Sequence, residues 1–171
     1  MRKHKHTMIF ASDLAGGIGF EHKLPWSIPE DLKKFAQVTK GKNLLMGRKT
    51  FESMESLGIK WGDRVPYVVT SVGETLPAVA AWVQPEYLYE ALEEEDEFVI
   101  IGGSSLFNDE YVLDTVGVVY QTLVKKVHTV DTMLFPCTLD YIENEFTREY
   151  SQDLTKDAVF IKRKRLDKQY T

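Results

Sequence analysis

Short apolar runs alternate along the chain with stretches of helical spacing. The apolar runs predict strands at residues 8–12, 43–46, 65–70, 80–83, 98–101 and 116–124. The helical spacing predicts helices at 29–39, from Thr50 onward, at 85–94 and at 104–113. Two closing runs alternate like an antiparallel ribbon, at 144–151 and 158–164. This order predicts an α/β fold in a single domain: a central, mostly parallel sheet with flanking helices and an antiparallel C-terminal ribbon.

One acidic residue stands out in the first predicted helix. Residues 27–30 are typical of a helix start, with Ser27 as the cap and a proline in the first turn. Residues four apart share a helix face, so Asp31 and Phe35 project together, with Val38 near the same stripe. A carboxylate beside an aromatic and an aliphatic side chain suggests an apolar pocket that holds one acid. The alternative is that Asp31 only stabilises the helix N-terminus, which is worth about 0.3–1 kcal/mol.

Two predicted strands end in glycine and each is followed by a helix. The sequences are Gly47-Arg48-Lys49-Thr50 and Gly102-Gly103-Ser104-Ser105. Free N–H groups at a helix start, together with the close backbone approach that glycine permits, favour phosphate binding. Two such points on one sheet suit a dinucleotide, although a glycine between a strand and a helix is also common where no ligand binds. Neither the Rossmann glycine fingerprint nor a phosphate-loop lysine motif is present.

Composition narrows the class of protein. The chain has 171 residues, a formal net charge of −5 and no dense basic patch, which argues against a nucleic-acid partner. A single cysteine, Cys137, excludes an intramolecular disulfide and fits a reducing compartment, so we expect a cytoplasmic protein. The apolar run after the basic start is too short for a signal peptide or a membrane span. We expect residues 1–6 to form a flexible extension without a metal site, despite His4 and His6, and residues 167–171 to form a tail.

Four ordered pieces of the chain resemble dihydrofolate reductase. They are Leu24-Pro25-Trp26 with Asp31 and Phe35, then Met46-Gly47-Arg48-Lys49-Thr50-Phe51-Glu52-Ser53, then Ile101-Gly102-Gly103, and last Asp131-Thr132 with Phe135-Pro136. The resemblance covers residues 7–166, the expected reductase domain. It implies the dihydrofolate-reductase-like fold and the reduction of dihydrofolate to tetrahydrofolate with NADPH. It also implies dihydrofolate and antifolate-like small molecules as ligands, and we expect a monomer.

The resemblance also implies roles for individual residues. Asp31 would bind the pterin N3 and 2-amino groups, with Thr122 as its partner and Leu24 as a further catalytic-site residue. The substrate would also contact Arg64, which would grip the glutamate α-carboxylate, and the apolar walls Ile9, Phe35, Met54 and Ile101. The loop 13–25 would close over the site, supported by Asp131. Since no His or Lys matches a position near N5, we expect water to deliver the proton there.

NADPH would contact a second set of residues. Arg48 and Lys49 would face the adenosine 2′-phosphate, and Gly102 and Gly103 would be joined by a cis peptide bond. The other implied contacts are Ala11, Ile18, Gly19, Gly47, Thr50, Thr70, Ser71, Ser104, Ser105 and Phe107. Gln84 and Ser105 stand where cations often occur in the family, so we expect a weaker preference for NADPH over NADH. The segment 55–63 is a few residues longer than in compact bacterial members.

Two other functions compete with this hypothesis. A pyrimidine reductase of riboflavin biosynthesis shares the fold, but it is not expected to combine the Trp26-to-Asp31 spacing with Arg64. A non-catalytic scaffold is the alternative from another class. It has no need of Asp31, Arg64 and the Gly102-Gly103 pair, so their presence favours the enzyme.

Overall fold

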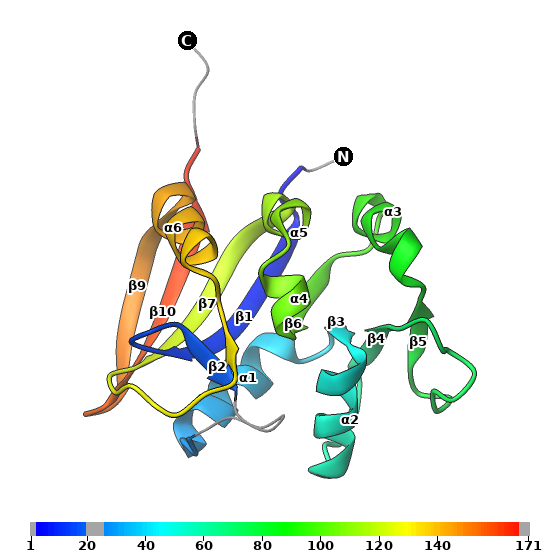
Figure 1. The fold of residues 1–171 in the computed structure, drawn as a ribbon, viewed down its shortest axis with the longest axis horizontal. Helices are drawn as coiled ribbons and strands as arrows, with labels where there is room; N and C mark the ends of the chain where they lie inside the picture. Colours follow the sequence, from blue (N-terminus) through cyan, green and yellow to red (C-terminus); the bar gives the residue numbers. More distant parts are fainter. Residues whose placement is uncertain (1–2, 20–25, 168–171) are drawn as a thin grey trace.

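Most strands of the chain assemble into one mixed sheet (Figure 1). The computed structural model describes residues 3–19 and 26–167, and within them eight strands pair in the order β5-β4-β3-β6-β1-β7-β10-β9. Their bounds are β1 His6–Asp13, β3 Asn43–Gly47, β4 Val65–Val69, β5 Ala81–Val83, β6 Phe98–Gly102, β7 Val116–Val124, β9 Phe146–Thr155 and β10 Ala158–Arg165. Strand β1 is parallel to β6 and β7, and β3 is parallel to β4 and β6. Strand β10 is antiparallel to both β7 and β9, which confirms the predicted ribbon.

Helices connect these strands and cover both faces of the sheet. Their bounds are α1 Pro29–Thr39, α2 Arg48–Ser56, the 3-10 turn η1 Pro85–Tyr87, α3 Leu88–Glu93, α4 Ser104–Phe107, α5 Glu110–Asp114 and α6 Pro136–Glu145. Two short strands, β2 Gly17–Gly19 and β8 Thr132–Met133, form a separate antiparallel pair. Among the residues that the structure describes, each helix is too short or too polar to span a bilayer.

The side-chain alternation of the central strands creates two apolar cores. In β1, Met8 and Phe10 belong to a cluster that also contains residues of α3, α4, α5 and α6. Ile9, between them, belongs to the opposite cluster, where Phe35 and Val38 of α1 and residues of α2 pack. Successive side chains of a strand point to opposite faces, so the two clusters lie on the two sides of the sheet. Phe35 and Val38, which were predicted to share a helix face with Asp31, pack on the side of the sheet that carries α1 and α2.

Three local predictions are corrected by the structure. Helix α1 spans the predicted residues, but its N-cap is Ile28 and no side chain caps it, so Ser27 is not the cap. The predicted helix 104–113 is divided into α4 and α5, because the Asp109 carboxylate accepts a hydrogen bond from the N–H of Val112 and starts a new helix there. Helix α2 begins at Arg48 rather than Thr50. Helix α6 and the β2–β8 pair had no prediction.

The predicted flexible extension ends earlier than residue 6. Strand β1 begins at His6, whose side chain is 1% exposed. Its Nε2 lies 2.8 Å from the carbonyl oxygen of Leu92, and its Nδ1 accepts a hydrogen bond from the N–H of Phe98 at 3.0 Å. Because both ring nitrogens have backbone partners, the imidazole is fixed in the fold. Within residues 3–19 and 26–167 no group of three or more His, Cys, Asp or Glu residues is placed to hold a metal ion.

Candidate active site

Asp31 and Thr122 meet on the face of the sheet covered by α1 and α2. The hydroxyl of Thr122, near the end of β7, donates a hydrogen bond to Asp31 Oδ1 at 2.5 Å. Burial raises the pKa of Asp31 above its ordinary value, and the hydrogen bond from Thr122 lowers this pKa in part. In the register of β1 and β7, Ala11 pairs with Thr122. The structure therefore places the half-buried Asp31 carboxylate beside its predicted partner Thr122, next to the strand that carries Ala11, a predicted cofactor residue.

Four predicted apolar wall residues pack together on the side of the sheet where Asp31 meets Thr122. Ile9, Phe35, Met54 and Ile101 come from β1, α1, α2 and β6, and all four belong to one apolar cluster. The acid is thus presented next to a surface that favours a flat, largely apolar ligand with polar edges. Leu24, the remaining residue predicted for this wall, lies outside the described residues.

The glycines at the strand ends approach one another closely. Strands β3 and β6 are parallel neighbours that end in Gly47 and Gly102, and the Gly102-Gly103 peptide bond is cis, as expected. A Cβ added at Gly102, where φ is +124°, would lie 3.2 Å from the Phe107 ring, and one at Gly103 would lie 3.4 Å from Thr50 Oγ1. The structure therefore brings five predicted cofactor residues together, and a side chain at Gly102 would be crowded by the Phe107 ring and strained by the positive φ.

The two predicted phosphate sites differ in the structure. Helix α2 has nine residues and begins directly after Gly47, so its first turn presents free N–H groups beside Arg48 and Lys49. Helix α4, which holds Ser104 and Ser105, has only four residues and contributes little dipole. The sequence analysis treated the two sites alike, because each is a glycine-terminated strand followed by a predicted helix.

Arg48 is held by three hydrogen bonds. Its Nε donates to Glu52 Oε1 at 2.8 Å, its Nη1 to the carbonyl oxygen of Val72 at 2.8 Å, and its Nη2 to Thr75 Oγ1 at 2.7 Å. Lys49 is exposed. Thr70 and Ser71, predicted for the adenosine side, stand at the start of the same loop as Val72 and Thr75. Arg48 therefore joins α2 to the predicted adenosine loop.

Arg64 stands beside the C-terminal end of α1. Its Nε donates to Thr39 Oγ1 at 2.9 Å and its Nη2 donates to the carbonyl oxygen of Ala36 at 2.8 Å. These bonds fix the guanidinium at the outer end of the apolar surface, and Nη1 takes no part in them. The longer segment 55–63 folds back onto α2, where the Trp61 ring stacks on Phe51 with centroids 5.7 Å apart.

Asp13 organises the loop that follows β1, a role that sequence reasoning missed. Its Oδ1 accepts hydrogen bonds from the N–H groups of Ala15 and Gly17, and its Oδ2 accepts one from His128. Burial alone would raise the pKa of Asp13, but these three bonds bring the pKa below its ordinary value. In an Asx turn, an aspartate accepts a hydrogen bond from the backbone N–H two residues later. The position of Asp13 before a predicted loop indicates such a turn, but nothing in the sequence links Asp13 to His128.

The predicted loop contacts are met in part. The Asp131 N–H donates to the carbonyl oxygen of Gly19 at 3.0 Å, so Asp131 does contact the loop. Ile18, assigned to the cofactor pocket, packs against the apolar cluster of the opposite face. The loop residues 20–25 lie outside the described part of the chain.

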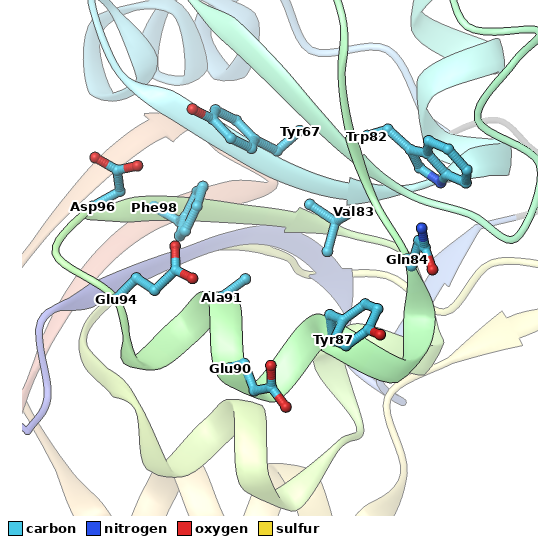
Figure 2. Close-up of a pocket in the computed structure, with 10 residues that line it drawn as sticks. All are labelled: Tyr67, Trp82, Val83, Gln84, Tyr87, Glu90, Ala91, Glu94, Asp96 and Phe98. Atoms are coloured by element: carbon cyan, nitrogen blue, oxygen red, sulfur yellow. The ribbon is translucent and has the colours of Figure 1, made fainter.

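A surface hollow of about 390 Å³ lies apart from Asp31, between β4, β5 and α3. Figure 2 shows Val83, Ala91 and Phe98 in its middle, with Glu94 and Asp96 toward one end. Trp82 and Gln84 stand at the other end (Figure 2). The Trp82 indole donates a hydrogen bond to the carbonyl oxygen of Thr70 at 2.7 Å. This end of the hollow therefore borders the loop that Arg48 contacts.

Comparisons with known proteins agree on one family. A family model described as dihydrofolate reductase matches residues 5–165. A dihydrofolate reductase of Staphylococcus aureus is 34% identical over 135 residues, which cover 78% of this chain and 80% of that protein. A bifunctional dihydrofolate reductase-thymidylate synthase of Paramecium tetraurelia is 33% identical over 122 residues, covering 69% of this chain but only 25% of that protein.

A solved structure shares the fold over nearly the whole chain. It is a dihydrofolate reductase from Enterococcus faecalis complexed with NADP(H) and RAB-propyl. The two structures match with a TM-score of 0.76 and 26% sequence identity, over 96% of this chain and 98% of that chain. The likeness therefore extends from the central sheet to the helices that carry the predicted site.

Proposed function

The chain belongs to the dihydrofolate reductase family, and we propose that it reduces 7,8-dihydrofolate to 5,6,7,8-tetrahydrofolate with NADPH at the sheet face that carries Asp31. The observation that carries the proposal is the hydrogen bond between Thr122 and Asp31, set beside the apolar cluster of Ile9 and Phe35. A half-buried acid in this setting recognises a flat heterocycle with hydrogen-bond donors along one edge. The pterin ring offers such an edge at N3 and its 2-amino group.

Asp31 binds and polarises the pterin in this proposal. Its carboxylate accepts hydrogen bonds from N3 and the 2-amino group. The hydroxyl of Thr122 donates a further hydrogen bond to Oδ1 and fixes the orientation of the carboxylate. Burial strengthens these bonds, because electrostatic interactions are stronger in a medium of low dielectric constant. Ile9, Phe35 and Met54 hold the two faces of the pterin and the neighbouring benzoyl ring.

The chemistry consists of one hydride and one proton. When bound, NADPH supplies the hydride from the nicotinamide C4 to C6 of dihydrofolate, and NADP⁺ is released. The N5=C6 double bond becomes a single bond, and N5 gains a proton. None of the wall residues is a His or a Lys, so water delivers this proton, and the negative charge of Asp31 favours the protonated pterin.

The residues at the strand ends fit a phosphate-rich dinucleotide. Gly47 and Gly103 are partly exposed and carry no side chain, so a ligand can approach the backbone there closely. The first turn of α2 supplies free N–H groups, with Thr50 at the pyrophosphate and Arg48 and Lys49 at the 2′-phosphate. Thr70 and Ser71 contact the adenosine, and Ala11 and Gly19 lie at the nicotinamide. This set combines cations, hydroxyls and glycine backbone, as such a cofactor requires.

Arg64 recognises the far end of the substrate. Its guanidinium, held by Thr39 and Ala36, meets the glutamate α-carboxylate of the folate tail. Antifolates that carry a similar heterocycle compete for the Asp31 end. We also propose that the protein acts as a monomer in the cytoplasm, which size-exclusion chromatography and fractionation would test.

The deciding experiment is NADPH oxidation followed by absorbance, with and without dihydrofolate. We expect oxidation only when dihydrofolate is present; stoichiometric folate binding without turnover would support the scaffold instead.

Asp31→Asn should fold normally but lose most turnover at neutral pH, because the amide lacks the negative charge. Activity should return in part at lower pH, where dihydrofolate is already protonated. Thr122→Val keeps the carboxylate and serves as the matched variant, and wild-type turnover by Asp31→Asn at neutral pH would remove Asp31 from the mechanism.

A further inference from the structure

The cations at the start of α2 oppose the local electrostatics of the helix. Arg48 and Lys49 are its first two residues, and no acidic residue lies in the first turn. The N-terminus of a helix carries partial positive charge, so cations there are unfavourable unless an anion is near. In the structure that anion is the Glu52 carboxylate, four residues along the same helix, which pairs with Arg48.

The adenosine loop holds Arg48 from the other side. Val72 and Thr75 accept hydrogen bonds from the two terminal nitrogens of the guanidinium. Trp82 anchors this loop through its bond to Thr70. Its ring also packs so tightly on Gly73 that an added Cβ would lie 1.8 Å from the ring. The acceptors of Arg48 are therefore on a segment that is itself held in place, beside the end of the hollow drawn in Figure 2.

The three bonds leave a defined part of Arg48 for a ligand. A guanidinium carries five N–H groups. Glu52 takes the one on Nε, and Val72 and Thr75 take one each on Nη1 and Nη2. One N–H on each terminal nitrogen takes no part in these bonds. Arg48 can keep its three partners and still donate two hydrogen bonds to phosphate oxygens.

We propose that Glu52 and Thr75 are positioning residues that set how strongly the protein prefers an adenosine 2′-phosphate. The inference rests on the proposed contact between Arg48 and that phosphate. Thr75 strengthens the preference, because it fixes the guanidinium before the ligand arrives. Glu52 has two opposing effects: its oxygen orients Arg48, but its negative charge offsets the positive charge of Arg48 and repels the phosphate. Replacing the charge while keeping the oxygen separates the two effects.

The test compares the binding of NADP⁺ and NAD⁺, which differ only in the 2′-phosphate, by calorimetry. Glu52→Gln retains an oxygen acceptor for Nε and removes the charge. We expect its Kd for NADP⁺ to fall about two- to fivefold, the range of an exposed ion pair, with an unchanged Kd for NAD⁺. The gain should shrink with added salt, since exposed charges are screened. Glu74→Gln is the matched control, because Glu74 is an exposed acid of the same loop.

Thr75→Val removes the hydroxyl acceptor at nearly constant shape. We expect its Kd for NADP⁺ to rise about two- to fivefold with no change for NAD⁺, and Thr75→Ser to restore the wild-type value. The KM for NADPH should change in the same direction as the Kd for NADP⁺ in each variant, while the KM for NADH and the kcat values stay constant. Equal changes for both cofactors, or equal gains in Glu52→Gln and Glu74→Gln, would overturn the inference.

Arg48→Ala distinguishes this inference from the proposal on which it rests. If Arg48→Ala leaves the preference for NADP⁺ intact, the assigned role of Arg48 is wrong. If Arg48→Ala abolishes the preference while Glu52→Gln and Thr75→Val leave it unchanged, Arg48 reads the phosphate and only the positioning inference fails.

Discussion

Replacing His6 by phenylalanine tests how far the ordered fold extends toward the N-terminus. The ring of His6 is 1% exposed, and its two nitrogens contact the backbone of Leu92 and Phe98. Phenylalanine has a similar shape and keeps the ring contact with Phe98, whose centroid is 5.5 Å away. It leaves one N–H and one carbonyl group buried without a partner, at a cost of about 1–3 kcal/mol each. We therefore expect His6→Phe to lower the free energy of unfolding by about 2–6 kcal/mol, a large share of the stability of an ordinary domain.

The same geometry makes His6 a source of acid sensitivity. Since the Phe98 N–H donates to Nδ1, the proton of the neutral ring is on Nε2, where it is donated to Leu92. Burial has the largest effect and lowers the pKa of His6; the hydrogen bond with Leu92 raises this pKa in part, and Lys5 and Glu93 have smaller effects of opposite sign. The folded pKa is thus below the unfolded one, so the unfolded chain binds more protons as the solution becomes acidic. The contribution of His6 is complete above about pH 6.5 and is lost as the pH falls toward the folded pKa.

Urea unfolding of the wild type and His6→Phe from about pH 7.5 to about pH 5.5 measures both effects. The wild type should lose stability through this window with a slope of at most about 1.4 kcal/mol per pH unit from this one group. His6→Phe should have a lower free energy of unfolding at about pH 7.5, and this free energy should fall less steeply as the pH is lowered. His4→Phe is the control, because His4 is exposed and its ring has one hydrogen-bond partner, the backbone carbonyl oxygen of Asp114. Equal stability and equal slopes for wild type and His6→Phe would refute a buried, neutral imidazole.

Two further predictions concern the ends of the site. Arg64→Leu should raise the KM for dihydrofolate about 10- to 150-fold with little change in kcat, the equivalent of about 1.5–3 kcal/mol, and steady-state kinetics would contradict it if kcat fell instead. Because Arg64 also bonds to Thr39, unfolding should show a modest loss of stability. Asp13→Asn should destabilise the fold by about 1–3 kcal/mol, because an amide cannot accept all three N–H bonds. Wild-type Asp13 should lose its contribution only as the pH falls below about 3.9 through its lowered pKa, which acid titration by circular dichroism can follow.

The strands were predictable because a buried strand is a short run of apolar residues in the sequence. The run 116–124 coincides with β7, and 8–12 lies wholly within β1. Helix α1 was predicted at its observed bounds from the proline in its first turn and the spacing of its apolar residues. The failure at 104–113 has a local cause, since helical spacing continues across Asn108 and Asp109 while Asp109 starts a new helix. Apolar spacing reports the face of an element and does not report a break within it.

The polar part of the candidate site was predictable only residue by residue. The sequence indicated Asp31 through its helix position and Thr122, Arg48 and Arg64 through a family resemblance, but it contained no sign of what holds the two arginines. The contact between Arg48 and Thr75 joins a helix to a loop, and that between Arg64 and Thr39 joins the residue before β4 to the end of α1. Such hydrogen bonds depend on distances between distant elements, which neither periodicity nor spacing encodes.

The placement of charge explains how one sheet edge can serve two different ligands. Strands β1, β3, β6 and β7 are parallel, so Gly47, Gly102 and the Thr122 end of β7 lie toward the same edge. At this edge α1 begins with an acid half-buried against the sheet, whereas α2 begins with two cations. The acid favours a heterocycle that carries donors and gains a proton, and the cations favour phosphate. Exchanging the two ligands would place phosphate beside Asp31, so repulsion fixes their order as firmly as attraction does.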